Sequence, residues 1–288
     1  MSTGTSAERL LASDVRAGGG SVARPASWLV GLSMVLAVIV TGTSLLGLFA
    51  PWVYASELPS WKVQAQGQDL GNLLAVIALV AGVFAAARGS LRGFQVWLGS
   101  LLYLAYAFVL YSMTVHFGAL FLPYVAALGL SAYCALFAVA GERRRPSVGV
   151  GARRFGAWAI GAIALLFGLL WLGSIVPALL AGVAPPELGE TGLVANPVHV
   201  LDLALVLPGM LITARQALRG TADGELLLAP WLVFAALMGA SIVAAMLLAQ
   251  GPVAPLAFVA LVTVVSTAAA WVVLRATSQA GCPEPNAP

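Results

Sequence analysis

Charged residues are scarce in this sequence: Asp, Glu, Lys and Arg together make up 9% of the 288 residues. Soluble domains carry about 25% charged residues, so this composition excludes an ordinary soluble protein. The alternation of polar and apolar positions that marks transmembrane strands is also missing. Instead, 61% of the residues are hydrophobic, in repeated apolar runs of about 20 residues. The sequence therefore predicts an all-α, polytopic transmembrane helical bundle.

Cysteine and histidine are nearly absent, with two residues of each. Cys134 lies in an apolar run and Cys282 near the C-terminus, and they form neither a disulfide framework nor a CxxC motif. His116 and His199 lack a spacing such as HxxxH, and a zinc site needs three or four ligands. No nucleophile motif or cofactor fingerprint appears elsewhere. We therefore expect no metal and no cofactor.

Eight apolar runs divide the chain. The first is too long for the core of a signal peptide and lacks a short basic n-region, so it predicts a membrane helix. Residues 1–26, rich in Gly, Ser and Ala, and residues 276–288 predict disordered cytoplasmic tails around a transmembrane domain at 27–275. The predicted helices cover residues 28–49, 71–87, 94–115, 119–140, 155–180, 197–214, 229–248 and 253–274, with polar loops at 50–70 and 184–195 and a kink at Pro208.

The basic residues predict the orientation. With both termini in the cytoplasm, all fourteen Lys and Arg residues except Lys62 fall on the cytoplasmic side. The net charge of +3 comes from short clusters at predicted helix ends, such as Arg143–Arg145, and does not indicate nucleic-acid binding. We expect a multi-pass protein of the bacterial cytoplasmic (inner) membrane, with membrane lipid as its partner.

Two predicted cytoplasmic turns share a sequence. Residues 87–93 read ARGSLRG and residues 214–220 read ARQALRG, at an offset of 127 residues (215 − 88). At the same offset Asp69 aligns with Asn196 and Asn72 with His199, and each pair has the i, i+3 spacing of one helix face. Four helices per half predict a parallel 4+4 repeat of residues 27–142 and 153–275. The alternative is convergence, because Arg and Gly are common in such turns.

The segment 196–202, NPVHVLD, opens the sixth predicted helix and holds the only carboxylate within a predicted apolar span. Ionisable groups in lipid usually face a bundle interior or a wet cavity, which makes Asp202 a functional candidate. His199 lies one turn before it, and a carboxylate beside an imidazole is typical of proton relays. The alternatives are that Asp202 caps a neighbouring helix or pairs once with a Tyr, and that His199 sits at the lipid–water interface.

Several polar residues are expected at one membrane depth near the extracytoplasmic face. The stripe of tyrosines on the third predicted helix either packs between helices or supplies hydroxyls, for which Asp202 is a plausible partner. The candidate residues of this polar cavity are Asp202, His199, Asn196, Asp69, Asn72, His116, Tyr103 and Tyr106.

Three stretches resemble an uncharacterised family of bacterial polytopic integral membrane proteins. They are residues 68–103, residues 196–230 and Phe121–Tyr124, and the resemblance covers most of residues 28–275. In that family an aromatic often stands at the position of His199, while a carboxylate at that of Asp202 is usual, which favours Asp202. The resemblance implies a topology and no activity.

Three functions follow from these features. The first is transport or sensing of a small molecule or ion through the polar cavity. The second is a structural or accessory membrane subunit whose polar residues only hold the bundle together. The third is a membrane-embedded enzyme that uses Asp202 and His199 as an acid–base pair. The sequence indicates neither a ligand nor an oligomeric state.

Overall fold

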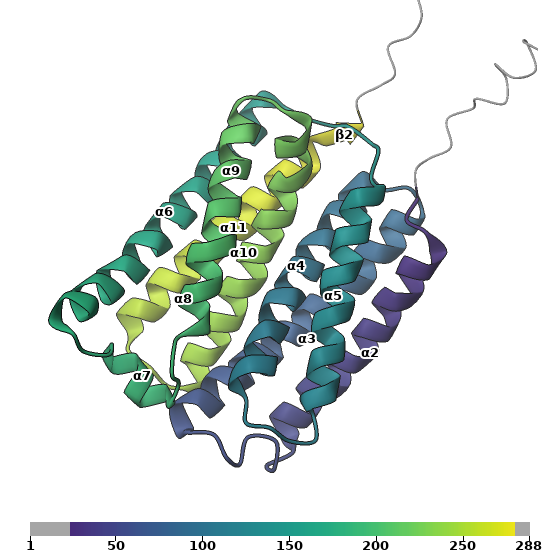
Figure 1. The fold of residues 1–288 in the computed structure, drawn as a ribbon. Coiled ribbons are helices and arrows are strands. Elements are labelled where there is room, and N and C mark those ends of the chain that lie inside the picture. Colours follow the sequence, from purple (N-terminus) through teal and green to yellow (C-terminus); the bar gives the residue numbers. More distant parts are fainter. Residues whose placement is uncertain (1–23, 280–288) are drawn as a thin grey trace, which may run out of the picture.

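The computed structural model describes residues 24–279, which form an all-α bundle (Figure 1). Eight helical segments within these residues are long and apolar enough to cross a membrane, as the sequence predicts. They are α2 (Ser27–Phe49), α3 (Pro59–Ala87), α4 (Leu91–Thr114), α5 (Phe121–Gly141), α6 (Val150–Ala181), the composite Pro197–Leu218, α10 (Ala222–Leu248) and α11 (Val253–Ala276). The composite consists of α8 (Pro197–Leu201), the π-helical turn η1 (Asp202–Val206) and α9 (Leu207–Leu218). A short helix, α7 (Pro186–Thr191), lies in the predicted loop before it.

Two helices begin well before their apolar runs. Helix α3 starts at Pro59 rather than at residue 71, because Pro fits the first helical position, where no N–H is needed. Helix α10 starts at Ala222 rather than at residue 229 and is capped by Thr221, whose side chain accepts the N–H of Gly224. The first turns of both helices are polar, so an apolar run marks only their membrane-embedded parts.

The helices form two groups of four (Figure 1). In the first group α2 packs on α3, α3 on α4, α4 on α5 and α5 on α2. In the second group α6, α9, α10 and α11 pack in the same cyclic order. The groups meet where α10 contacts α3 and α4. This arrangement agrees with a 4+4 repeat, and the repeat itself stays a prediction.

The turns after α3 and α9 correspond in backbone, but at a different offset from the sequence alignment. Gly89 and Gly220 both have positive φ, of 90° and 71°. Ser90 and Thr221 then cap the next helix by accepting the N–H of the residue three positions on. Both pairs are separated by 131 residues (220 − 89 and 221 − 90). The alignment at 127 is therefore wrong for this turn, because it matches Gly220 with a residue inside α4.

A small sheet joins the connection between α5 and α6 to the segment after α11. Strand β1 (Pro146–Val148) pairs antiparallel with β2 (Thr277–Gln279). Residues 277–279, expected in a disordered tail, are thus part of the fold. Ala276, also expected in that tail, is the last residue of α11, and residues 1–23 and 280–288 of the two expected tails lie outside the described residues. We call this end of the bundle the sheet end, and the opposite end, with residues 50–58 and 115–120, the loop end (Figure 1).

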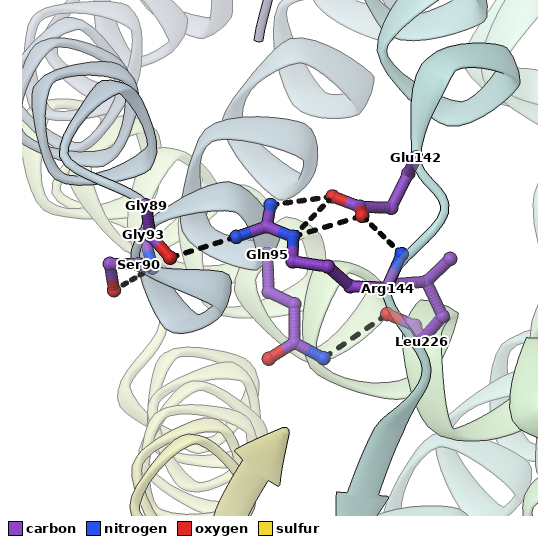
Figure 2. Close-up of polar contacts among 7 residues, drawn as sticks. All are labelled: Gly89, Ser90, Gly93, Gln95, Glu142, Arg144 and Leu226. Carbon is purple, nitrogen blue, oxygen red and sulfur yellow. Dashed lines mark hydrogen bonds and ion pairs between the residues drawn. The ribbon is translucent and has the colours of Figure 1, made fainter. Parts of the chain in front are cut away.

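Buried ion pairs fix the connection between the two groups at the sheet end. Figure 2 shows Arg144 paired with Glu142 and bonded to the carbonyl of Gly89. The Nη2 and Oε2 atoms of the pair are 2.5 Å apart, and Arg144 Nη1 donates to the Gly89 carbonyl at 2.9 Å. In a second pair, Arg153 Nη1 lies 2.6 Å from Glu225 Oε1, and Glu225 also accepts the N–H of Val148. Arg144 therefore anchors the connecting segment to the α3–α4 turn.

Candidate functional site

The structure separates the eight predicted cavity residues into three places. Asp69, Asn72 and Tyr103 lie inside the first group of helices; Asn196, His199, Asp202 and Tyr106 lie around α8 and η1; His116 lies on the surface of the loop end. The strongest polar centre forms around Asp69, which the sequence placed at the start of a helix.

Asp69 is inside the membrane-spanning helix α3 and is 1% exposed. Its Oδ2 accepts the hydroxyl of Tyr54 at 2.7 Å, and its Oδ1 accepts the hydroxyl of Tyr111 at 2.8 Å. Gly47 of α2 makes room for this cluster, because a Cβ there would collide with the Asp69 carboxylate. Asp202 is therefore not the only carboxylate within a span. We call Asp69, Tyr54 and Tyr111 the Asp69 site.

Tyr54, Tyr111 and Gly47 are not among the residues predicted from the sequence. Tyr54 comes from the turn after α2 and reaches back into the bundle, where it is buried. Burial and the nearby Asp69 carboxylate raise the pKa of Tyr54 well above its usual value. Its hydroxyl therefore stays protonated and can donate to Asp69. An apolar pattern cannot show such a contact, because it depends on the path of a short loop.

Further polar groups surround the Asp69 site without completing their hydrogen bonds. Asn72, one turn after Asp69, donates its Nδ2 to Ser44 Oγ at 3.3 Å, while its buried Oδ1 has no partner among the described residues. The ring centroids of Tyr124 and Tyr111 are 5.0 Å apart. The Tyr124 hydroxyl is also buried and has no hydrogen-bond partner within residues 24–279.

Tyr103 connects this region to the second group of helices. Gln68 donates its Nε2 to the Tyr103 hydroxyl at 2.6 Å, and Ser241 of α10 donates to Gln68 Oε1 at 3.3 Å. Tyr103 therefore supports the α3–α10 contact and does not reach Asp202.

Asp202 is bound by α6 and faces α4. Trp171 of α6 donates its Nε1–H to Asp202 Oδ2 at 2.8 Å, and the Tyr106 hydroxyl lies close to the same carboxylate. The predicted contact of Asp202 with a Tyr of α4 thus involves Tyr106.

The π-helical turn begins at Asp202, and Leu207 N–H bonds to the Asp202 carbonyl five residues back. Pro208 has no N–H to continue the α-helical ladder, so the backbone widens just before it.

His199 and Asp202 do not form the predicted relay. The His199 ring instead packs against Trp171, with ring centroids 4.6 Å apart. Its Nε2 lies 3.4 Å from Nδ2 of Asn196, whose Oδ1 caps α8 by accepting the N–H of Val198. Among the described residues, His199 and Asp202 share Trp171 as a neighbour and have no hydrogen bond to each other.

His116 belongs to the loop end. Its side chain is 66% exposed, and its Nδ1 lies 3.0 Å from Oε1 of Glu57, which also accepts the backbone N–H of His116. These contacts tie the segment after α4 to the loop before α3. No group of three His, Cys, Asp or Glu side chains within residues 24–279 is arranged to hold a metal ion.

Two small pockets flank the Asp69 site at the loop end. The first has a volume of about 160 Å³, and its lining includes Gly47, Tyr54, Lys62 and Gln66. The second has a volume of about 70 Å³, and its lining includes His116 and Tyr124. Tyr54 thus lies between the first pocket and Asp69. Neither of these pockets is lined by Asp202, His199 or Asn196.

Comparisons with protein-family models, with curated proteins and with solved structures find no match. The resemblance to an uncharacterised membrane family therefore stays an expectation. The eight apolar helices define the class of the protein, which is a polytopic α-helical integral membrane protein.

Proposed function

We propose that the protein transports or senses a small ion or small polar molecule, and that the first pocket and the Asp69 site form its binding site. One observation carries this proposal: a pocket at one end of the bundle is lined by Tyr54, and the hydroxyl of the same residue binds Asp69 within the span. Asp69 therefore takes the role that the sequence predicts for Asp202.

The charge of the Asp69 site supports a functional role. A buried carboxylate in a membrane is costly, and one kept only for structure is usually paired with a cation. The ion pairs of the described residues all lie elsewhere, and none includes Asp69. Two hydroxyl groups stabilise the carboxylate without neutralising it, which leaves its charge for a ligand.

The size of the first pocket limits that ligand. One water occupies about 30 Å³ of liquid, and sites for drug-sized molecules measure roughly 300–1,000 Å³. A pocket of about 160 Å³ therefore fits an ion with a few waters or a molecule of a few heavy atoms. Lys62 and Gln66 in its lining offer polar contacts to such a ligand.

The proposed orientation places this pocket outside the cell. The described basic residues other than Lys62 lie towards the sheet end, for example at the α3–α4 turn, the β1 segment and the α9–α10 turn. By the positive-inside rule the sheet end faces the cytoplasm of a bacterial inner membrane, with both termini inside.

Flux measurements on the full chain test the proposal. The protein is reconstituted into liposomes of phosphatidylethanolamine and phosphatidylglycerol, and the entry of protons, Na⁺ or Cl⁻ is followed under a potassium diffusion potential. We expect flux above that of empty liposomes for one of these ions. Asp69→Asn should lower it about tenfold, equivalent to about 1.4 kcal/mol, whereas Asp202→Asn should stay near the wild type. Thermal unfolding with the same ions tests sensing.

An accessory subunit is the second candidate. It is favoured by α6, which has little buried surface within its apolar window, with Leu169 and Leu179 exposed. Flux equal to that of empty liposomes, together with no shift of unfolding by any of the three ions, would support this role and overturn transport and sensing. The geometry does not support the enzyme, because the acid–base pair has no hydrogen bond between His199 and Asp202, whose described partners are Asn196 and Trp171.

A further inference from the structure

We propose that Asp69 is a reversible proton-binding site, which exchanges its proton with the first pocket through the hydroxyl of Tyr54. The inference rests on the proposed function and names the proton as the ion that the Asp69 site binds.

The contacts of Asp69 satisfy both protonation states. In the ionised state, Tyr54 donates to Oδ2 at 2.7 Å and Tyr111 donates to Oδ1 at 2.8 Å. In the protonated state, Oδ2–H donates back to the Tyr54 oxygen, and the Tyr54 hydroxyl turns its own proton to the pocket. Tyr111 still donates to Oδ1, since a carbonyl oxygen accepts as well. A hydroxyl both donates and accepts, so only one hydrogen has to change its direction.

Tyr54 also supplies the route. Tyr54 is buried and belongs to the lining of the first pocket, as does Gly47. Its hydroxyl lies beside Gly47, since a Cβ built there would be 2.6 Å from the hydroxyl oxygen. A hydronium in the pocket gives a proton to the Tyr54 oxygen while Tyr54 passes its own proton to Oδ2. The pocket is left with water, Tyr54 with one proton as before, and Asp69 as the neutral acid. The reverse steps release the proton to the same pocket.

The neighbours of Asp69 leave its charge to be neutralised by a small ion. Helix α2 contributes Ser44 and Gly47 and contains no titratable residue, and the titratable residues of α10, Asp223 and Glu225, lie in its first turn at the sheet end. The remaining titratable groups around the Asp69 site are Tyr54, Tyr103, Tyr111, Tyr124, Glu57 and Lys62, with Glu187 and Glu190 on α7, which packs against α3. The hydroxyls stay neutral, and Lys62 forms no ion pair with Asp69.

Asp202 is a natural control because no described residue connects it to the two pockets at the loop end. The donor to Asp202 Oδ2 is the indole N–H of Trp171, a group that donates and does not accept. The hydroxyl of Tyr106 lies close to the same carboxylate, but neither Asp202 nor Tyr106 lines either of the two pockets at the loop end. The same bundle therefore holds one buried carboxylate that a hydroxyl connects to a pocket and one that has no such connection.

Infrared difference spectroscopy on the full chain in liposomes tests the proposal. When the pH is lowered, the carbonyl stretch of a protonated carboxylic acid should appear in the wild type and in Asp202→Asn, and should be lost in Asp69→Asn. Wild type labelled with ¹³C at the aspartate side-chain carboxyl should shift this band, which needs no substitution in the Asp69 site. Equal spectra for wild type and Asp69→Asn, or no shift on labelling, would overturn the proposal.

The relay is tested by its rate. After a pH jump, the band should form about tenfold more slowly in Tyr54→Phe, which is about 1.4 kcal/mol in the barrier, while Tyr133→Phe on α5, whose side chain is 63% exposed, should keep the rate of the wild type. Equal rates in Tyr54→Phe and wild type would remove the relay.

A band whose midpoint moves when NaCl replaces choline chloride would show that Na⁺ competes, and would overturn the proton as the sole ligand. The infrared signal reports protonation whether or not any ion is transported, so its loss with intact flux overturns this inference alone.

Discussion

Trp171 of α6 donates its indole N–H to Asp202 at 2.8 Å and at the same time packs its ring against His199. One side chain therefore joins α6 to both polar residues of the α8–η1 segment. The two predicted partners, His199 and Asp202, are connected through a tryptophan instead of directly.

Replacing Trp171 by Phe should destabilise the protein. An aromatic ring remains at position 171, but Asp202 loses the N–H donor. A hydrogen bond to a charged group contributes about 1.5–3 kcal/mol to stability. Thermal unfolding in detergent should show a lower midpoint. Trp158→Phe is the matched control on the same helix, because Trp158 is 67% exposed and should tolerate the change. Equal midpoints for the two variants would contradict the role of the hydrogen bond.

Close packing between α3 and α10 predicts a second effect. A Cβ on Gly67 would collide with the backbone of Ala245, so Gly67→Ala should cost about 1–3 kcal/mol through overpacking. Gly31→Ala is the control, since nothing lies within 4 Å of a Cβ there, and Ala is favoured over Gly in a helix by up to about 1 kcal/mol. Chemical unfolding in mixed micelles measures the free energy of unfolding of both variants. An unchanged value for Gly67→Ala would show that α3 and α10 can separate at no cost.

Two ion pairs at the sheet end should differ strongly in their contribution to stability. Glu142→Gln leaves the buried Arg144 without its partner, and breaking a buried pair costs about 3–5 kcal/mol. Arg145 and Asp223 pair at 3.3 Å with both side chains largely exposed, so Asp223→Asn should cost about 1 kcal/mol or less. Comparable losses of unfolding free energy in the two variants would contradict the larger contribution of the Glu142–Arg144 pair.

The proposed orientation can be tested by labelling single cysteines. In a chain whose Cys134 and Cys282 are replaced by Ser, Ser56→Cys at the loop end should react with a membrane-impermeant maleimide on intact cells. Ser147→Cys at the sheet end should react only after the cells are permeabilised. Both serines are exposed in the structure. The opposite labelling pattern would invert the topology.

The sequence predicts the number and type of the membrane helices because each span needs a long apolar run, and such runs are visible without tertiary information. It misplaces the starts of α3 and α10, because Pro59 and Thr221 begin polar turns outside those runs. The error at α3 matters for the site. With a helix from residue 71, Asp69 is a loop residue, whereas with a helix from Pro59 it is a carboxylate inside the bundle.

The partners of the two carboxylates lie beyond the reach of sequence patterns. Tyr54 comes from a loop and Tyr111 from a helix with several tyrosines, and only the fold selects which of them meets Asp69. The tyrosine near Asp202, Tyr106, follows from the expected stripe on α4. Trp171 was indistinguishable from an interfacial aromatic, because its bond to Asp202 depends on how α6 packs against the α8–η1 segment.

The π-helical turn η1 also bears on the ancestry of the two halves. A π-type turn holds one residue more than the α-helical turn that it replaces. Positions of the first half that precede this turn therefore correspond to positions 130 residues later in the second half (131 − 1). In agreement, Asp202 precedes Gly220 by 18 residues, whereas Asn72 precedes Gly89 by 17. Asp69 then corresponds to His199, and Asn72 to Asp202. A duplicated ancestor would have carried polar residues at both positions, and its two copies would have diverged by keeping the acid in the first position of one half and in the second position of the other.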